Sequence, residues 1–579
     1  MRWRELTAAV AATMLLGGCA AVPTVGPVRE HGSRQEQVDS SVRVAPVPPA
    51  PDATAMLVVE GFLHAMGTDQ ADFAVARQYL TPAADLAWRP EDGTSIYADG
   101  YQLREAETST EDQPVITLEA VLTGTLNAKG EYREASGGLR PDFGVVRDED
   151  GQWRISRPPE GLLISRYHFL TNYTAVDLNF LDLSGSALVP DQRFFAVNSL
   201  TPETVAAAVL SGPGDWLAPA VRRTTWPSLR IEEVDSLPQG VALVQLSTSA
   251  LGLTDAERLT VMAEMTQTLM ELPEVTAVQF GVGSTLLPLP GTTAVTLTTK
   301  DFSELAPATE PGAGQLLAVR DGSVRVVTRT ASWTEGDQIA PALTEVGTVA
   351  AVGNLSEVAG VTADGTTLAV TVAGSDTQTV LLEGRNLLRP DYSRQRELWA
   401  IGNDADAAGF TVFAAGDHAP IPVTAQDIPV ETVRAFRISP DGVRIALVLD
   451  GLVVDGEAVE QLGVARIVRD AEGIRLEAFR TVSVSPPAEA GRRIVDVGWQ
   501  TATELLVLLS HRVTSSVVRV DQDSALPEDI GPSEISGLVE LAVVPAGQAV
   551  VRGSASLYRY EGPFNWKPIT VAVDAIGYS

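Results

Sequence analysis

Residues Val361–Val370, VTADGTTLAV, decide the fold of the C-terminal half of the chain. They have the pattern of a strand, an Asp-Gly turn and a second strand, and residues Ile438–Leu447, ISPDGVRIAL, repeat it. Weaker copies of the unit lie near Asp321, Glu397, Glu504 and Val544. Strand-turn units at intervals of about 40 residues are typical of a β-propeller, so residues 300–579 are predicted to form one with about five to seven blades. A pair of β-sandwiches is the alternative, because the spacing of the units is irregular and does not give one number of blades.

Residues 159–291 combine helix and strand patterns. Thr201 and Pro202 have the composition of a helix start, and Thr254 with Glu257 forms a capping box. The helix after Thr254 is predicted to place Leu259, Met262, Thr266 and Leu269 on one face. Together with predicted strands over 176–181, 193–197, 241–246 and 275–282, these patterns indicate an α/β domain.

The segment Ser211–Trp216, SGPGDW, follows the first of these helices. Together with Arg222 and Arg223, it has two interpretations. It is either a loop that faces a ligand or a helix cap followed by a solvated turn, and the second is favoured because Gly-Pro commonly ends a helix.

Residues 52–158 begin with a helix pattern over 53–66 and continue as alternating strands over 115–121, 143–146 and 153–155. This order predicts an α+β domain and resembles the NTF2-like fold, in which a sheet wraps a helix and leaves a pocket. Four aromatic residues either line such a pocket or belong to the core, and the core is favoured. They are Trp88, Tyr97, Tyr101 and Trp153.

The N-terminus carries the chain's only cysteine, Cys19. Arg2 and Arg4 precede an apolar run from Leu6 to Leu16, which is the order of an export signal. The pattern resembles the bacterial lipobox, and this resemblance implies that Cys19 carries S-diacylglycerol and an N-acyl chain. Residues 1–18 are then a signal peptide, and the proline-rich residues 19–51 a flexible tether. An ordinary signal peptide with an incidental cysteine is the alternative.

The composition is that of folded protein, with 45% hydrophobic and 20% charged residues among 579. A net charge of −32 argues against a nucleic-acid partner, because phosphate binding needs concentrated Lys or Arg. It also argues against adsorption to anionic headgroups, so the lipid on Cys19 is expected to supply attachment to the extracytoplasmic face of the cell membrane.

Catalytic motifs are not found in the sequence. The five histidines are scattered, and no nucleophile elbow, phosphate loop or paired metal-binding histidines occur. Residues Asn403–Gly409 faintly resemble a calcium loop but lack two of its oxygen ligands, so a solvated turn is predicted. We therefore expect a protein that is not an enzyme and has no catalytic residues, cofactor or metal. A hydrolase or lyase would be the alternative if carboxylates or histidines were clustered at the axial mouth of the propeller.

Several patterns of residues 159–291 look like the GerMN domain of spore-germination and cell-envelope proteins. They are Leu178–Asp182, Val209–Pro213 and Thr268–Pro273. The order of lipobox, tether, NTF2-like domain, GerMN domain and propeller resembles the LpqB family of actinobacterial lipoproteins. This resemblance implies an accessory regulator that contacts the extracytoplasmic domain of a sensor histidine kinase, MtrB of the MtrA–MtrB system, and affects the cell envelope and division. The alternative is a module that binds cell-wall glycan or peptidoglycan.

Overall fold

The computed structural model describes residues 46–579 except 68–70, 223–227, 306–313, 330–332, 403–408, 455–456, 485–492, 512–513, 523–526, 533–534, 546, 555 and 570. Cys19, the signal peptide and most of the predicted tether therefore lie outside the described residues, as does most of the loop 403–409. Within the described ranges, no helix has both the length and the apolar character needed to cross a membrane.

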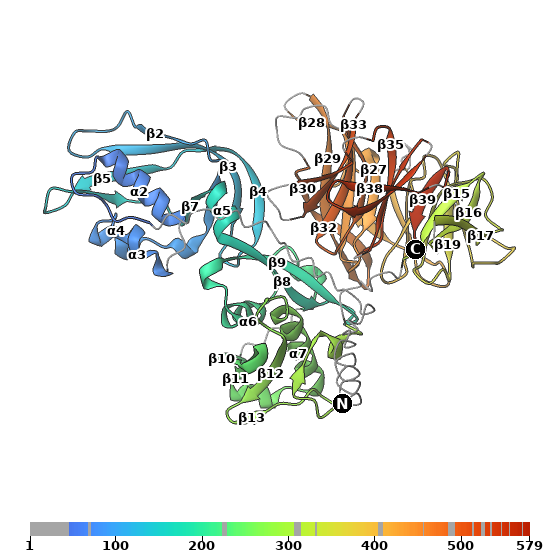
Figure 1. Cartoon of the computed structure of the whole chain (residues 1–579), viewed down its shortest axis with the longest axis horizontal. Helices are drawn as coiled ribbons and strands as arrows, with labels where there is room; N and C mark the ends of the chain where they lie inside the picture. Colours follow the sequence, from blue (N-terminus) through green and yellow to red (C-terminus); the bar gives the residue numbers. More distant parts are fainter. Residues whose placement is uncertain are drawn as a thin grey trace, which may run out of the picture. The chain divides into compact units, whose positions relative to one another are not determined.

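The N-terminal domain is a helix packed on a sheet (Figure 1). α2 (Ala55–Gly67) confirms the predicted helix, and it buries Val58, Phe62 and Met66 against β6 and β7. The sheet follows the order β6-β5-β3-β1-β7, with β2 and β4 also paired to β3. The other elements are η1 (Ala71–Phe73), α3 (Ala74–Arg77), α4 (Pro82–Ala87), η2 (Pro90–Asp92), β1 (Thr94–Tyr97), β2 (Gln102–Glu105), β3 (Val115–Leu126), β4 (Tyr132–Leu139), β5 (Asp142–Arg147), β6 (Trp153–Arg157), β7 (Leu162–Ser165) and α5 (Arg166–Asn172).

Two features of this domain bear on the sequence predictions. β1 pairs in parallel with β7, so the sheet extends past the boundary predicted at residue 158. Trp88 and Tyr97 are 3% and 2% exposed and lie in the core, where the indole nitrogen of Trp88 donates to the Gly161 carbonyl at 3.1 Å. Tyr101 and Trp153 pack at the edge of that core. The α+β class is confirmed, and the NTF2-like fold stays a prediction.

The middle domain, from β8 to η7, contains a hairpin, a sheet and two main helices. The sheet has the order β10-β11-β12-β13, and β11 and β12 are parallel. Thr201 caps α6 and Thr254 caps α7 through the predicted capping box. The elements are β8 (Tyr173–Leu181), β9 (Leu188–Ala196), η3 (Val197–Ser199), α6 (Pro202–Ser211), η4 (Ala218–Ala220), β10 (Ile231–Leu237), η5 (Pro238–Gly240), β11 (Val241–Leu246), η6 (Thr248–Gly252), α7 (Asp255–Leu269), β12 (Ala277–Val282), β13 (Thr285–Leu286), β14 (Thr296–Leu297) and η7 (Thr299–Phe302).

The predicted face of α7 needs a correction. Leu259 is 38% exposed, whereas Met262, Thr266 and Leu269 are buried together with the charged residue Glu264. α7 contacts β8, β12 and α6, so its buried surface is wider than one apolar stripe.

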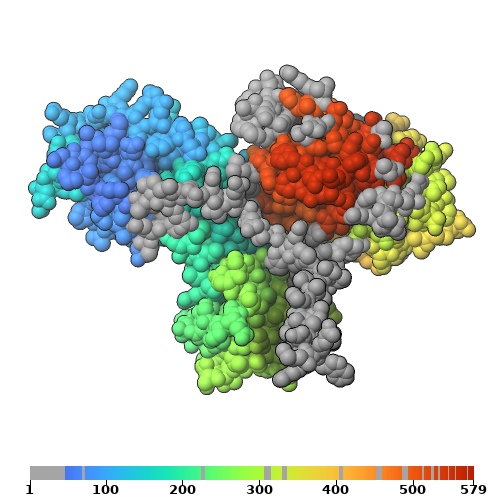
Figure 2. Space-filling view, viewed as in Figure 1, coloured from blue at the N-terminus to red at the C-terminus, as the bar shows by residue number. Residues whose placement is uncertain are grey.

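The C-terminal part is a propeller of six sheets in the described residues. Their inner strands β39, β18, β22, β27, β31 and β35 contact one another in that cyclic order. The last strand, β39, pairs with β15 and closes the ring, and Figure 2 shows the red C-terminal blades adjoining the yellow-green first blade. Closure confirms the predicted propeller and excludes the sandwich pair.

The blades are built from consecutive antiparallel strands, and β26 adds to one of them in parallel. The strands are β15 (Leu316–Arg320), β16 (Ser323–Arg329), β17 (Trp333–Gln338), β18 (Val346–Ala351), β19 (Val358–Thr362), β20 (Thr367–Thr371), β21 (Thr379–Glu383), β22 (Asp391–Tyr392), β23 (Leu398–Gly402), β24 (Gly409–Phe413), β25 (Pro420–Ile421), β26 (Val423–Ala425), β27 (Val433–Ile438), β28 (Arg444–Val454), β29 (Glu457–Asp470), β30 (Gly473–Val482), β31 (Arg493–Trp499), β32 (Glu504–His511), β33 (Thr514–Asp521), β34 (Glu528–Gly531), β35 (Leu538–Val543), β36 (Ala549–Gly553), β37 (Leu557–Gly562), β38 (Asn565–Ile569) and β39 (Ala575–Tyr578), with η8 (Val430–Thr432) before β27.

The two Asp-Gly units are turns between neighbouring strands of a blade, as predicted. Gly365 lies between β19 and β20 at φ 68°, and Gly442 lies between β27 and β28 at φ 74°. Each donates its amide to the carbonyl three residues earlier at 2.8 Å. A positive φ at this position favours glycine, so the backbone conformation of the turn explains why both units have Gly there.

Candidate functional site

The segment after α6 is a partly buried connection. Gly212 caps α6 at φ 86°, as predicted, and its amide donates to the Val209 carbonyl at 3.0 Å. Four residues later, Trp216 is only 8% exposed. The favoured interpretation from sequence was therefore right about the cap; the solvated turn holds for Ser211 and Asp215, which are exposed, and not for the buried residues Pro213, Gly214 and Trp216.

The Trp216 indole lies among three arginines of the propeller. The guanidinium carbons of Arg444, Arg466 and Arg480 lie 5.9, 6.0 and 4.7 Å from the ring centre. The indole N–H donates to the Ala478 carbonyl at 2.8 Å, and Arg466 donates back to the Trp216 carbonyl. Cations over an indole face are attracted by its quadrupole, more strongly where water is excluded. Trp216 thereby fastens the middle domain to β28, β29 and β30.

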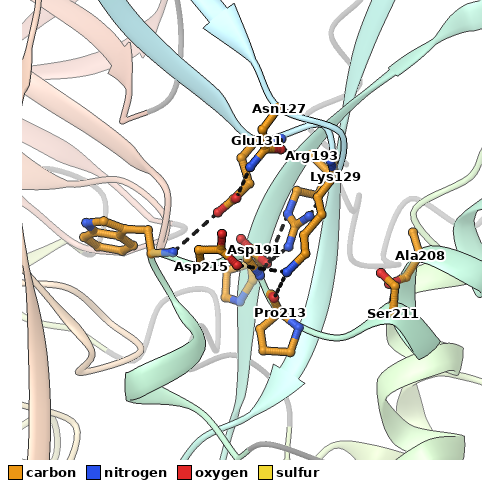
Figure 3. A network of polar contacts seen from close by, with 12 residues as sticks. Asn127, Lys129, Glu131, Asp191, Arg193, Ala208, Ser211, Pro213 and Asp215 are labelled. Carbon is orange, nitrogen blue, oxygen red and sulfur yellow. Dashed lines mark hydrogen bonds and ion pairs between the residues drawn. The ribbon is translucent and has the colours of Figure 1, made fainter. Parts of the chain in front are cut away.

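The N-terminal domain reaches the same segment through the β3–β4 turn (Figure 3). Lys129 pairs with Asp215 at 2.9 Å and its ammonium also reaches the Pro213 carbonyl at 3.4 Å. Glu131 accepts the Trp216 amide at 3.5 Å. A Cβ on Gly214 would collide with the Glu131 carboxylate, so a larger residue there would have to displace the Glu131 side chain.

The β9 strand supplies a third set of contacts to this segment (Figure 3). Asp191 accepts the Gly214 amide at 2.7 Å and pairs with Arg193 at 2.6 Å. Arg193 also donates to the Lys129 carbonyl at 2.8 Å. We call the contacts of Ser211–Trp216 with β3–β4, β9 and β28–β30 the Trp216 junction. It connects all three domains through one short segment.

A second buried polar arrangement fastens α7 to the free edge of β8. The Leu181 amide donates to Glu264 at 3.1 Å, and the Asn179 amide donates to the Thr268 hydroxyl at 2.9 Å. Residues four apart on a helix and two apart on a strand share a face, so the helix satisfies alternate amides of the strand. Burial raises the pKa of Glu264 to about 8, despite the opposing effect of the Leu181 amide.

Glu264→Gln is expected to flatten the pH dependence of stability. The folded pKa of about 8 lies above the ordinary 4.5, so between these values the native state binds more protons and stability falls as pH rises. Glutamine keeps the acceptor for the Leu181 amide and does not titrate. Between pH 4.5 and 8, the wild type loses at most about 1.4 kcal/mol of unfolding free energy per pH unit through Glu264, and the glutamine variant does not.

Urea unfolding at pH 5, 6.5 and 8 measures this difference. Glu257→Gln on the same helix is the control with the opposite sign, because the capping hydrogen bonds from Thr254 lower the pKa of Glu257. Replacing Glu257 should therefore lower the free energy of unfolding only at pH values where its carboxylate is ionised. Wild-type and Glu264→Gln profiles that run parallel would contradict the assignment.

Four residues of the inner strands and one residue just before β22 form an axial charge network: Asp391, Arg437, Asp496 and Glu540, with Arg389. Arg389 pairs with Asp496 at 3.3 Å and with Glu540 at 3.9 Å, and Arg437 pairs with Asp496 at 3.2 Å. Burial raises the pKa of Asp391 to about 6 and also raises that of Asp496 and Glu540.

This network is the carboxylate cluster that a propeller hydrolase would need, but its partners belong to the blades. Asp496 accepts the Leu541 amide at 3.0 Å, Glu540 accepts the Ile576 amide at 3.1 Å, and Asp391 accepts the Ile438 amide at 2.8 Å. Among the residues described, no group of three His, Cys, Asp or Glu side chains is arranged to hold a metal ion. The hydrogen bonds from Leu541, Ile576 and Ile438 show what the network does in the fold: it connects neighbouring inner strands.

The remaining residues singled out from the sequence do not gather at the junction. Arg222 donates to the Leu183 and Ser184 carbonyls at 3.2 and 2.8 Å and holds the β8–β9 turn, whereas Arg223 and Cys19 lie outside the described residues. His64 and His168 do meet, with ring centres 5.3 Å apart on the N-terminal domain. Glu264, Arg389 and Arg444 were missed, since no local pattern marks a buried charge.

Comparison with known proteins assigns the three parts. A family model described as "Lipoprotein LpqB, N-terminal domain" matches residues 48–170. One described as "Sporulation and spore germination" matches residues 177–287, and one described as "Lipoprotein LpqB beta-propeller domain" matches residues 314–575. The predicted GerMN-like middle domain and C-terminal propeller are thereby confirmed.

Related chains are similar along almost the whole length. "Lipoprotein LpqB" of Cutibacterium acnes is 30% identical, covering 98% of this chain and 97% of its own length. "Lipoprotein LpqB" of Thermobifida fusca is 29% identical over 86% of this chain and 85% of its own. The solved tandem GerMN domains of the sporulation protein GerM from Bacillus subtilis are 17% identical, over 27% of this chain and 58% of that one, with a TM-score of 0.20. On the match to the Cutibacterium acnes relative, the chain belongs to the LpqB family of lipoproteins.

Proposed function

We propose that this lipoprotein regulates a two-component sensor kinase by contact, on the extracytoplasmic face of the cell membrane, and catalyses no reaction. The observation that carries the proposal is where the buried charge lies. A catalytic site needs charged groups that a substrate reaches. At the Trp216 junction and in the axial charge network, the buried arginines and carboxylates instead bind this chain's own domains and blades together.

Attachment to the membrane is proposed to depend on Cys19. Membership of a lipoprotein family supports an anchor, and Cys19 is the only thiol that a lipid can modify in this chain. Two or more acyl chains hold a protein stably at a bilayer, whereas one holds it reversibly.

Cys19→Ser is expected to abolish lipid labelling completely. Cells fed an alkyne analogue of palmitate should label the wild-type chain, and the serine variant should carry no label because no other cysteine exists. In-gel fluorescence of the purified chain measures this. Label that persists on the serine variant would contradict the assignment of Cys19.

The proposed partner is the extracytoplasmic domain of an MtrB-like sensor kinase, and the support for it is the resemblance to the LpqB family. An anchored protein meets a membrane kinase at a high effective concentration, so a weak contact is enough. To regulate, the chain must bind two kinase states with different affinities.

Reconstitution of both proteins in the same vesicles tests this function. Adding the lipidated chain is expected to change kinase autophosphorylation several-fold. The Cys19→Ser chain at equal bulk concentration is expected to change it much less, because its effective concentration at the membrane is lower. Autophosphorylation that the anchored chain leaves unchanged would overturn the regulatory function.

Glycan binding has less support. A glycan could bind in the predicted pocket of the N-terminal domain, but of its four predicted aromatic residues Trp88 and Tyr97 lie in the hydrophobic core, and Tyr101 and Trp153 pack against that core. A glycan could also bind at the centre of the propeller, but that place contains the axial charge network.

A further inference from the structure

The β8–β9 hairpin of the middle domain contacts the propeller directly. Arg444 at the start of β28 donates to the Pro190 carbonyl of β9. Arg394 donates to the Ser186 carbonyl at the turn of the hairpin at 3.4 Å. Together with Trp216, these contacts set how the middle domain is held on the propeller.

Two buried oxygens on this hairpin have no hydrogen-bond donor among the described residues. They are Oδ1 of Asp177 and Oε1 of Gln192. Asp177 on β8 and Gln192 on β9 are directly opposite each other in the antiparallel register. Side chains at such positions lie close enough to interact. A proton on Asp177 supplies the donor that this pair of acceptors lacks.

The charges that face Asp177 come from four elements and are mostly negative. Those with the largest effect on its ionisation are the carboxylates Asp191 of β9, Glu271 just after α7 and Asp521 of β33, and the guanidinium of Arg444 of β28. The Arg444 guanidinium is already engaged by Asp441 and by the Gln522 amide oxygen, the latter at 3.1 Å. An ionised Asp177 therefore adds a negative charge beside other carboxylates, next to an Arg444 guanidinium that is already bonded to other groups.

We propose that the contact between the β8–β9 hairpin and the propeller is a pH-responsive joint: a proton on Asp177 holds it closed, and loss of that proton in alkaline surroundings loosens it. The inference concerns this chain alone and stands independently of the kinase partner. The sign follows from the two acceptors, which lose their donor, and from the repulsion by Glu271 and Asp521, which increases when Asp177 ionises.

Asp177 is expected to gain and lose its proton in the physiological pH range. Burial, followed by the nearby Glu271 and Asp521 carboxylates, raises the pKa of Asp177 to about 7. Burial also raises the pKa of Glu271. The change in the joint is therefore centred near neutral pH.

A pair of fluorophores across the joint tests the proposal. Leu251 in η6 and Val372 after β20 are each 61% exposed, one on the middle domain and one on the propeller. In the full chain with Cys19→Ser, cysteines at these two positions are the only labelling sites. We expect transfer efficiency between the dyes to shift between pH 5.5 and 8.5 with a midpoint near 7.

Two variants locate the cause of the shift. Asp177→Asn should keep the acid value of the transfer efficiency at every pH, because asparagine is neutral and supplies a donor. Glu232→Gln removes an exposed carboxylate from β10 of the same domain and should follow the wild type. A wild type that does not respond, or an asparagine variant that responds like it, overturns the proposal.

A third variant decides the matter should Asp177→Asn fail to fold. Glu271→Gln keeps Asp177 and removes a carboxylate that disfavours its ionised form, so the midpoint of the change in transfer efficiency should move to higher acidity. A midpoint equal to that of the wild type would overturn the proposal.

Discussion

Trp216→Ala is expected to uncouple the three domains. The indole lies among three arginines, and both its N–H and its backbone carbonyl are bonded to the propeller. Truncating a buried tryptophan costs about 3–5 kcal/mol, and here that cost falls on contacts between domains. In calorimetry, the variant should therefore unfold in separated transitions at lower temperature, and limited proteolysis should cut between domains that resist it in the wild type.

Trp153→Ala is the matched control. Trp153 also lies under a cation, with the Arg147 guanidinium 4.2 Å from its ring centre, but both residues belong to the N-terminal domain. This control should lower the stability of one domain and leave the coupling intact. If Trp216→Ala retains the wild-type unfolding profile, the junction does not couple the domains.

Arg389→Met is expected to destabilise the propeller by about 3–5 kcal/mol. It removes one of the two arginines that pair with Asp496, at 3.3 Å, and also the cation beside Glu540, so Arg437 alone must balance Asp496, and a buried charge that is poorly balanced is costly. Arg389 also donates to the Leu541 carbonyl at 3.1 Å and the Ile576 carbonyl at 3.4 Å, so it connects β35 to the closing strand β39. Its loss weakens the closure of the ring.

The pH dependence and a surface control identify the cause of that loss. Burial already raises the pKa of Asp496, and removing Arg389 raises it further, so protonation at pH 5 relieves the variant and the deficit grows towards pH 8. Arg475→Met breaks an exposed pair with Asp470 and should cost about 1 kcal/mol or less. Denaturant unfolding of both variants at the two pH values measures this. Equal losses for both would contradict the role of Arg389.

Local signals predicted local structure well. The Asp-Gly turns at Gly365 and Gly442 and the cap at Thr254 depend on residues within a few positions, so the sequence alone identifies them. The face of α7 was predicted less well, because periodicity assumes one apolar stripe. Glu264 is buried and accepts a hydrogen bond from the Leu181 amide of β8, and the residues next to Glu264 in the sequence do not indicate this contact.

The Trp216 junction was beyond prediction for a different reason. Its contacts join residues as far apart as Trp216 and Ala478, and no local pattern encodes such a pairing. The SGPGDW segment has the composition of a helix cap and a loop, yet whether a short loop faces solvent or another domain is decided by residues elsewhere. The same holds for Asp177, whose unpaired oxygen becomes visible only beside Gln192 on the paired strand.

Crosslinking in intact membranes tests the central claim most directly, because it examines location and partner together. A photoreactive crosslinker is placed on the exposed propeller residue Val372 in the lipidated chain, and the same label is placed on a Cys19→Ser chain as control. The account predicts that mass spectrometry of the anchored chain's adducts identifies the extracytoplasmic domain of a sensor kinase, and that the control loses most of that adduct. Adducts of the anchored chain that contain no sensor kinase, from this position or from the other exposed propeller positions Val380 and Val539, would contradict it.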